Sequence, residues 1–187
     1  EGAAEGILQG LYRLRPAPEM KGAPRVQLLG SGSILNEVLK AQTLLGERFG
    51  VAADAWSATS YLALRREALE AERWNLLHPG ESPRMPRVTA ILQDASGPVV
   101  AATDYLKAVP DQVARWIPGG LFSLGTDGFG RSDTRPALRR HFEVDAAFIA
   151  LAALRQLALR GEKTPAEVQQ AIQDLGIDPG KADPATA

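Results

Sequence analysis

The sequence predicts an α/β fold, a three-layer α/β/α sandwich in which helices cover both faces of a mostly parallel sheet. Two observations lead to this fold class. Short apolar runs alternate with longer segments whose apolar residues recur every three or four positions, as expected for strands that alternate with helices. The 187 residues, of which 45% are hydrophobic and 23% are charged, suit one globular domain.

The first half of the chain is predicted to contain three strands and two helices. Pro16 and Pro18 end the first strand, because proline cannot donate a hydrogen bond to a neighbouring strand. The second strand leads through a Gly-Ser-Gly-Ser turn into a helix, which has apolar residues at helical spacing and ends at Gly50. The predicted strands are residues 11–14, 26–29 and 51–57, and the predicted helices are residues 34–49 and 61–77.

The second half is predicted to contain two more strands and to be otherwise mostly helical. Three prolines between positions 79 and 86 impose an irregular connection before a short helix or strand. Thr164 and Glu167 form a capping box around Pro165, because each can satisfy an unpaired backbone amide at the start of a helix. The predicted strands are residues 98–103 and 121–124, and the short helix or strand is residues 88–93. One helix is predicted to end near residue 117, another includes Leu138 and Phe142, and two more span residues 145–160 and 165–175. A mobile tail is predicted at residues 178–187.

The composition excludes several classes of protein. With 21 Lys and Arg against 22 Asp and Glu, the net charge is −1, so we expect no binding to nucleic acid or to an anionic membrane. There is no cysteine, which excludes a disulfide scaffold and a thiolate nucleophile. The longest mostly apolar stretch, residues 144–154, is too short for a membrane span of about 20 residues. We therefore expect a cytoplasmic protein, and the start at Glu1 in place of methionine indicates a piece of a longer chain.

The Gly-Ser-Gly-Ser turn at residues 30–33 is open to two interpretations. It could hold an anion at the start of the helix, which would make the chain a stand-alone nucleotide- or anion-binding module. A dinucleotide fingerprint would need a third glycine at position 35, where the chain has Leu35, so a tight structural turn is favoured. The two histidines, His78 and His141, lack the helix spacing of a metal pair, and no metal ligand is assigned.

A glycine-rich segment at residues 125–133 follows the last predicted strand, where an α/β sheet usually places a ligand loop or a domain contact. The favoured interpretation is a salt-linked turn, with Arg131 between Asp127 and Asp133 and with Asp133 or Thr134 capping the next helix. The alternative is a contact with another domain, a second subunit or a partner. Trp74 stands between the polar residues Arg73 and Asn75, which suits a half-buried contact in the core or at an interface. The candidate structural or interface residues are Asp127, Phe129, Arg131, Ser132, Asp133, Arg73, Trp74, Asn75 and His78, and none is predicted to be catalytic.

Two further surfaces are predicted from the pattern of side chains. The basic residues at 135 and 139–141 would form a face that is solvated or meets an acidic partner. The helix at 145–160 carries apolar residues on more than one side, including Phe148, Ile149 and Leu157, so part of it must meet a second layer. That layer would be the last helix of the chain or another subunit.

Four phrases occur along the chain in the same order as in one known family. They are Glu-Arg-Trp-Asn-Leu-Leu-His-Pro at 72–79, Ala-Thr-Asp-Tyr-Leu-Lys at 102–107, the segment 125–133, and His-Phe-Glu-Val-Asp-Ala at 141–146. Together they resemble the carboxy-terminal domain of the homodimeric bacterial pyruvate dehydrogenases, a transketolase-like family. The resemblance covers nearly the whole chain.

This resemblance implies a particular sheet and a particular domain organisation. The sheet would have five strands, with residues 11–14 antiparallel to the others. Residues 1–9 would leave a middle domain that is absent from the chain, and residues 10–177 would form the carboxy-terminal domain. The same domain of another transketolase-fold enzyme is an alternative.

For function, the resemblance implies an intact enzyme that decarboxylates pyruvate with thiamine diphosphate and Mg²⁺ and acetylates the lipoyl group of an acyltransferase component. The family's cofactor motif is Gly-Asp-Gly, followed further along by paired asparagines. This chain has Gly-Thr-Asp-Gly at 125–128 and only the separate asparagines Asn36 and Asn75, so it is expected to bind neither cofactor. Its expected role is to support the dimer and the catalytic domains. Its partners would be the remaining domains, the second subunit and the lipoyl-bearing acyltransferase component.

Overall fold

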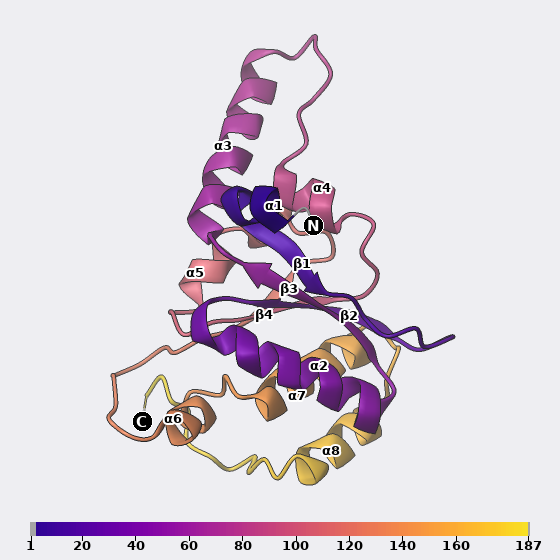
Figure 1. Cartoon of the computed structure of the whole chain (residues 1–187), viewed down its shortest axis with the longest axis vertical. Helices are drawn as coiled ribbons and strands as arrows, with labels where there is room; N and C mark the ends of the chain where they lie inside the picture. Colours follow the sequence, from indigo (N-terminus) through magenta and orange to yellow (C-terminus); the bar gives the residue numbers. More distant parts are fainter. Residues whose placement is uncertain (1–2, 187) are drawn as a thin grey trace.

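The computed structural model describes residues 3–186 and shows a five-stranded mixed sheet between two layers of helices (Figure 1). The strands lie in the order β1-β3-β2-β4-β5; β1 runs antiparallel to β3, and the other neighbours are parallel. Their bounds are β1 Leu11–Arg15, β2 Arg25–Gly30, β3 Ala52–Ala58, β4 Val99–Ala102 and β5 Leu121–Leu124. The predicted fold class, with five strands and an antiparallel first strand, is confirmed.

Each face of the sheet has its own hydrophobic core, because successive residues of a strand point to opposite faces. Along β2, Val26 and Leu28 lie in one core, whereas Leu29 lies in the other. Parallel strands that are covered by helices on both faces read as nearly continuous apolar runs. The central strands β2, β3 and β4 are accordingly buried along almost their whole length.

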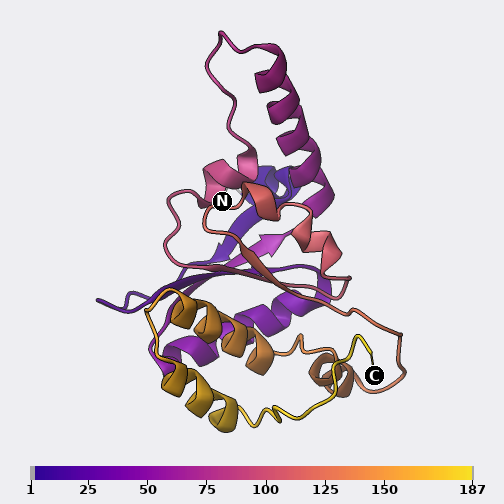
Figure 2. The ribbon, with the colours of Figure 1, turned by 180° about the vertical axis from the view of Figure 1, so that it is seen from behind.

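The first helical layer consists of α2 (Leu35–Phe49), α7 (Ala146–Leu159) and α8 (Pro165–Asp174). α7 packs against both α2 and α8, and Figure 2 shows α7 and α8 side by side below the sheet. Ile149 and Leu157 of α7 are fully buried, while Leu159 at its end is exposed. The last helix of the same chain thus packs against α7, which is one of the two alternatives predicted for its outer side.

The second helical layer consists of α3 (Tyr61–Leu77), α4 (Arg87–Leu92) and α5 (Ala108–Asp111). The helix predicted to continue to residue 117 is broken into two parts: α5 is a single turn, and a 3₁₀ turn follows at Ala114–Trp116. Pro110 lacks an N–H and is tolerated only in the first turn of a helix, so α5 cannot begin further upstream.

The remaining helices connect this body to the chain ends. α1 (Ala3–Gln9) precedes β1, and α6 (Arg135–His141) links β5 to α7. The tail returns to the loop after β5, where a Cβ on Gly128 would lie 2.3 Å from the carbonyl oxygen of Pro184. Residues 1, 2 and 187 lie outside the described residues. The origin of the leading segment in another domain and the mobility of the tail stay predictions.

Candidate functional site

The carboxyl ends of β2 and β4 mark the point where the chain changes its direction across the sheet. The two strands are parallel neighbours, with Gly30 opposite Ala102. The chain leaves β2 toward α2 on one face and leaves β4 toward α5 on the other. Ligands of open α/β sheets bind in the crevice that opens at such a switch point.

A cavity of about 310 Å³, here called the switch-point cavity, lies at this edge of the sheet. Sequence reasoning singled out Arg131 as a candidate, Arg135 and Arg139 as part of a basic face and Ser33 as part of the Gly-Ser-Gly-Ser turn, but it did not bring them together. The signal for a common site was position: Ser33, Asp104 and Thr126 closely follow β2, β4 and β5, whose carboxyl ends meet at one edge. The cavity is lined by Ser33, Ile34, Asp104, Thr126, Gly130, Arg131, Arg135, Leu138, Arg139, Phe142 and Val144.

The Gly-Ser-Gly-Ser turn is structural. Ser31 Oγ donates a hydrogen bond to Thr103 Oγ1 at 2.7 Å, which joins the ends of β2 and β4. The carboxylate of Asp104 stands in front of the turn: its Oδ1 would lie 2.8 Å from a Cβ on Gly32, and its Oδ2 accepts from Ser33 Oγ at 3.2 Å. A phosphate at this turn would meet a negative charge, so the geometry disfavours the anion-binding module.

The salt-linked turn predicted at residues 125–133 is wrong. Arg131 is exposed and forms no ion pair within residues 3–186. Asp127 instead accepts a hydrogen bond from the Lys107 N–H at 3.0 Å, and its other oxygen lies 3.8 Å from Lys107 Nζ. The reason is tertiary, because Thr126 N–H donates to the carbonyl of Tyr105 and brings the segment after β4 alongside Asp127.

The rest of this loop is exposed to solvent. Phe129 is 84% exposed, and Ser132 and Asp133 are exposed as well. Asp133 accepts a hydrogen bond from the Thr134 N–H at 2.6 Å. Thr134 is the residue that caps α6, since its Oγ1 accepts from the Ala137 N–H at 3.4 Å.

His141 borders a second, smaller cavity of about 290 Å³, which shares the lining residues Arg131 and Leu138 with the first. Its Nε2 is buried and has no hydrogen-bond partner in the described part of the chain. Burial of the ring, together with the charges of Arg131 and Lys181, lowers the pKa of His141 below its ordinary value of 6.5. The lowered pKa favours the neutral form of the ring.

Two arginines of α6 are held inside the chain. Arg139 Nη1 lies 2.9 Å from Oε1 of Glu37, which is 5% exposed. Arg140 Nη1 lies 3.2 Å from Asp145 Oδ2. Of the basic face predicted at 135 and 139–141, Arg135 is the exposed arginine, so the solvated face is smaller than expected.

The other predicted candidates lie at the outer end of α3. Trp74 stacks on His78 with ring centroids 4.5 Å apart, and the Arg84 guanidinium carbon lies 4.1 Å from the Trp74 ring centroid. Asn75 accepts from the Arg84 N–H at 2.7 Å and donates to its carbonyl at 2.9 Å, which fastens the following loop to the helix. Arg73 is exposed beside them. Figure 1 places this tip at the top and the loop into α6 at the lower left, so the two sets of candidates are not brought together.

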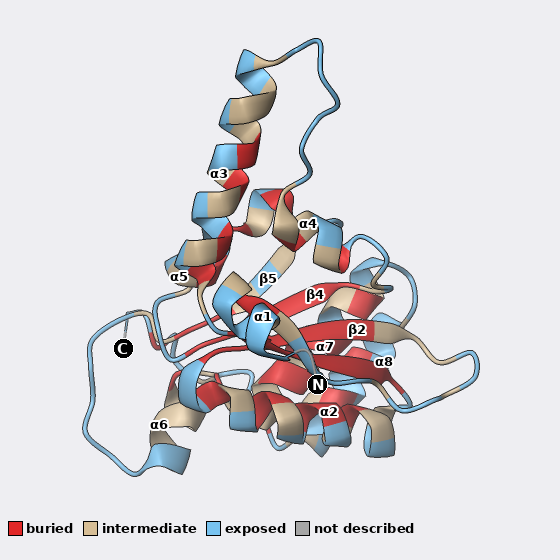
Figure 3. Cartoon of the chain, turned by 45° about the horizontal axis from the view of Figure 1, so that its top comes forward, coloured by how far each residue is buried: buried red, intermediate tan, exposed pale blue. Residues whose placement is uncertain are grey.

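The tip of α3 presents apolar side chains to solvent. Leu76 is 78% exposed, and Leu77 and Met85 are exposed by more than half. Figure 3 shows that the buried residues of α3 lie on the part nearer the sheet. Beyond Ala71 no residue of α3 is buried within residues 3–186, and exposed apolar side chains of this kind are typical of an interaction surface.

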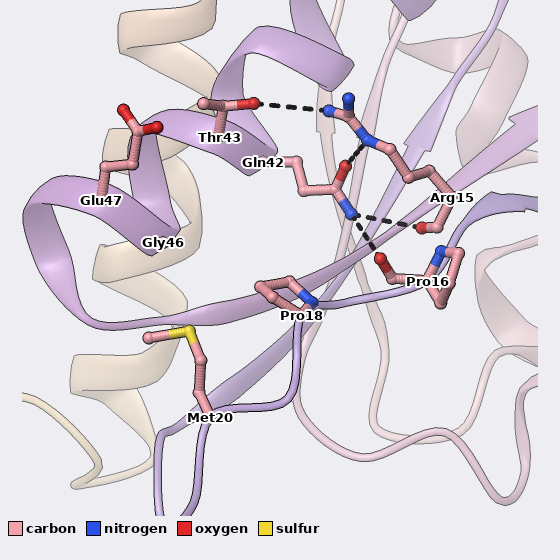
Figure 4. A pocket seen from close by; sticks show the side chains of 8 residues that line it. All are labelled: Arg15, Pro16, Pro18, Met20, Gln42, Thr43, Gly46 and Glu47. Carbon is pink, nitrogen blue, oxygen red and sulfur yellow. Dashed lines mark hydrogen bonds between the residues drawn. The ribbon is translucent and has the colours of Figure 1, made fainter.

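A larger cavity of about 470 Å³ lies between the β1–β2 loop and α2 (Figure 4). Gln42 faces this loop from α2. Its amide nitrogen donates to the carbonyl oxygens of Arg15, Pro16 and Ala53, and its oxygen accepts from Arg15 Nε. Because both polar atoms of Gln42 are satisfied, this residue ties the loop to the helix and leaves no free group for a ligand.

The described residues offer no set of ligands for the Mg²⁺ that the resemblance implies. Among residues 3–186, no group of three or more His, Asp or Glu side chains could hold a metal ion. Mg²⁺ requires oxygen ligands in a near-octahedral arrangement. No helix in the described part is long and apolar enough to cross a membrane.

Comparison with known proteins agrees with this fold. The profile of the family described as transketolase-like TK C-terminal domain matches residues 10–145. The chain belongs to this family. It is 49% identical over 185 residues to the pyruvate dehydrogenase E1 component of Pseudomonas aeruginosa, and 48% identical over 188 residues to that of Escherichia coli K12. These alignments cover 98% and 100% of this chain but 21% of each relative, so the chain spans a small part of their length.

Solved transketolases share the fold at low sequence identity. The enzyme from Leishmania mexicana is 20% identical with a TM-score of 0.54, and the match covers 83% of this chain and 19% of that one. A transketolase from Pichia stipitis in complex with sedoheptulose 7-phosphate is 18% identical with a TM-score of 0.56, covering 85% and 19%. At such identities the likeness shows the fold alone.

Proposed function

We propose that this chain is the carboxy-terminal domain of a pyruvate dehydrogenase E1 component, a cytoplasmic homodimer. The observation that carries the proposal is the identity of 46–49% to proteins of that name in several bacteria over nearly the whole chain. The order of the four phrases at 72–79, 102–107, 125–133 and 141–146 supports it over another transketolase-fold enzyme.

The intact protein would decarboxylate pyruvate and transfer the acetyl group to the lipoyl arm of an acyltransferase component. Thiamine diphosphate and Mg²⁺ would supply the carbanion stabilisation that decarboxylation requires. The residues that hold them would lie in domains outside this chain, since residues 3–186 offer no ligand set. The contribution of this domain would then be structural.

The outer part of α3 is the element best suited to this structural role. The stack of Trp74, His78 and Arg84 and the two hydrogen bonds of Asn75 hold the tip in one conformation, so little entropy is lost when a partner docks. Exposed leucines on a rigid helix offer apolar area to a neighbouring domain or subunit. We propose that this tip and the loop around Phe129 are contacts with the rest of the dimer.

The activity is tested on the intact protein that contains this chain. We expect CO₂ release from pyruvate only when thiamine diphosphate and Mg²⁺ are both present, and acetylation of a lipoyl-bearing acyltransferase component. The 187-residue chain alone is expected to show no thiamine diphosphate binding by calorimetry, with the intact protein as the control. A micromolar site in the isolated chain, worth about 8 kcal/mol, would contradict the proposal, as would turnover of ketose phosphates without turnover of pyruvate.

The structural role is tested by replacing the exposed leucines in the intact protein. The double variant Leu76→Ser/Leu77→Ser should raise the dissociation constant of the dimer by about tenfold or more in sedimentation velocity. Leu62→Ser is the matched control, since Leu62 is also exposed but lies at the inner end of α3. Equal dimer affinity for the double variant and the control would show that the tip is no interface.

A further inference from the structure

The switch-point cavity combines an apolar floor with a polar rim. The floor is formed by Ile34 in the turn after β2, by Leu138 of α6, and by Phe142 and Val144 in the segment that follows α6. Its volume of about 310 Å³ is at the lower end of the range for small-molecule sites. The lining therefore suits a compact ligand with an apolar body.

Positively charged side chains outnumber negatively charged ones around this cavity. Arg139 is paired with Glu37 and is thereby neutralised. Arg131 and Arg135 also line the cavity and form no ion pair in the described part of the chain. Asp104 is the single acid of the lining. Two unpaired arginines against one aspartate leave an excess of positive charge that attracts an anion.

Asp104 does not occupy the place of that anion. Its carboxylate is held on the β2 side by the hydrogen bond from Ser33 Oγ at 3.2 Å, and its own carbonyl accepts from Thr126 Oγ1 at 2.9 Å. Arg131 and Arg135, in contrast, come from the loop before α6 and from its first residue. The acceptor and the two arginines of the rim therefore belong to different segments of the chain, and no ion pair joins them within residues 3–186.

We propose that the switch-point cavity binds a small organic anion, a carboxylate or a phosphate monoester on a compact apolar body. The anionic group pairs with Arg131 and Arg135, because a guanidinium presents a fork of donors that matches carboxylate and phosphate oxygens. The body covers the floor formed by Leu138 and Phe142, and Asp104 accepts from a hydroxyl where the ligand carries one. Binding of this anion requires no cofactor, and it does not depend on the structural role proposed above.

The test uses ¹⁹F NMR of the intact protein, saturated with thiamine diphosphate and Mg²⁺ so that any other phosphate site is filled. The probes are 4-fluorophenyl phosphate, 4-fluorobenzoate and the neutral 4-fluorobenzyl alcohol. Arg131→Gln and Arg135→Gln should each weaken binding of the better anionic probe by about fivefold or more. Arg155→Gln is the matched control, an exposed arginine on α7 outside the cavity, and it should change binding by less than about twofold.

The relative affinities of the two anionic probes distinguish a phosphate ester from a carboxylate as the natural ligand chemistry. Binding of the neutral alcohol as tightly as the anions would overturn the proposal, because the arginines would then contribute nothing. An equal loss of affinity in Arg155→Gln would also overturn it, because binding would then depend only on the overall charge of the protein. The absence of saturable binding up to about 10 mM would overturn it as well. None of these outcomes bears on pyruvate turnover, which is measured separately.

Discussion

Arg139 Nη1 lies 2.9 Å from the buried Oε1 of Glu37, a residue 102 positions away in the sequence. The same carboxylate accepts from Lys40 Nζ at 2.8 Å and from the Ala146 N–H at 3.2 Å. Burial alone would raise the pKa of Glu37, but the hydrogen bonds from Lys40 and Ala146 and the nearby charges hold it below its ordinary value of 4.5. One acid thus joins α2 to α6 and to the start of α7.

Arg139→Gln should lower the free energy of unfolding by about 1–3 kcal/mol, because it leaves a buried carboxylate with fewer donors. Urea unfolding of the 187-residue chain measures this change. Lys40→Gln is the matched control, since Lys40 contacts the same oxygen from an exposed position and should cost less than about 1 kcal/mol. A smaller loss in Arg139→Gln than in the control would refute this assignment.

The capping box predicted from the sequence is present at the start of α8. Thr164 Oγ1 accepts from the Glu167 N–H at 3.2 Å, and Glu167 Oε2 accepts from the Thr164 N–H at 2.7 Å. Thr164→Ala should cost about 1 kcal/mol in urea unfolding. Thr134→Ala should cost less, because its cap bond is longer at 3.4 Å and residue 137 is an alanine that cannot return a bond.

The capping box of Thr164 and Glu167 also predicts that the stability of the chain depends on pH in the acidic range. The hydrogen bond from the Thr164 N–H, with those from Lys163 and the Thr164 hydroxyl, lowers the pKa of Glu167 to about 2. The folded-state pKa is below the unfolded one, so the stabilisation is complete above about pH 4.5 and is lost as the pH falls toward 2. Glu167→Gln should remove this part of the acid dependence, and an unchanged acid profile would contradict it.

Gly97 lies in the turn before β4 with a φ of +91°, and a Cβ there would lie 1.8 Å from the carbonyl oxygen of Arg25. Gly97→Ala should therefore cost more than about 3 kcal/mol or prevent folding. Gly46→Ala, inside α2 with no atom within 4 Å of the added carbon, should instead stabilise the chain by up to about 1 kcal/mol. Circular dichroism during thermal unfolding separates the two, and equal effects would argue against the clash.

Arg131→Gln should leave the free energy of unfolding in urea at about pH 8 within about 0.5 kcal/mol of the original, because Arg131 holds no ion pair within residues 3–186. It should raise the pKa of His141, measured by NMR, since removal of a nearby positive charge favours the imidazolium. The depressed pKa means that His141 contributes stability above pH 6.5, which is lost as the pH falls through the folded-state pKa. That loss should be smaller in Arg131→Gln than in Arg155→Gln, and an identical pH profile would contradict the coupling.

The sequence by itself determined the order and type of most elements. α3 and β5 have the predicted bounds, and the capping box of Thr164 and Glu167 is formed as predicted. These features depend on residues within a few positions of one another, whose periodicity and capping chemistry are local. The same locality explains why α5 begins only at Ala108, because Pro110 is tolerated only in the first turn of a helix.

Only the tertiary structure decided which charges meet. Within its own loop, Arg131 was the nearest cation to Asp127, yet Lys107 from the segment after β4 is its partner. The Arg139–Glu37 pair and the switch-point cavity likewise join segments far apart in the sequence. The physical reason is that Coulomb attraction and cavity walls depend on distance in space, which the packing of helices on a sheet sets and which sequence spacing does not encode.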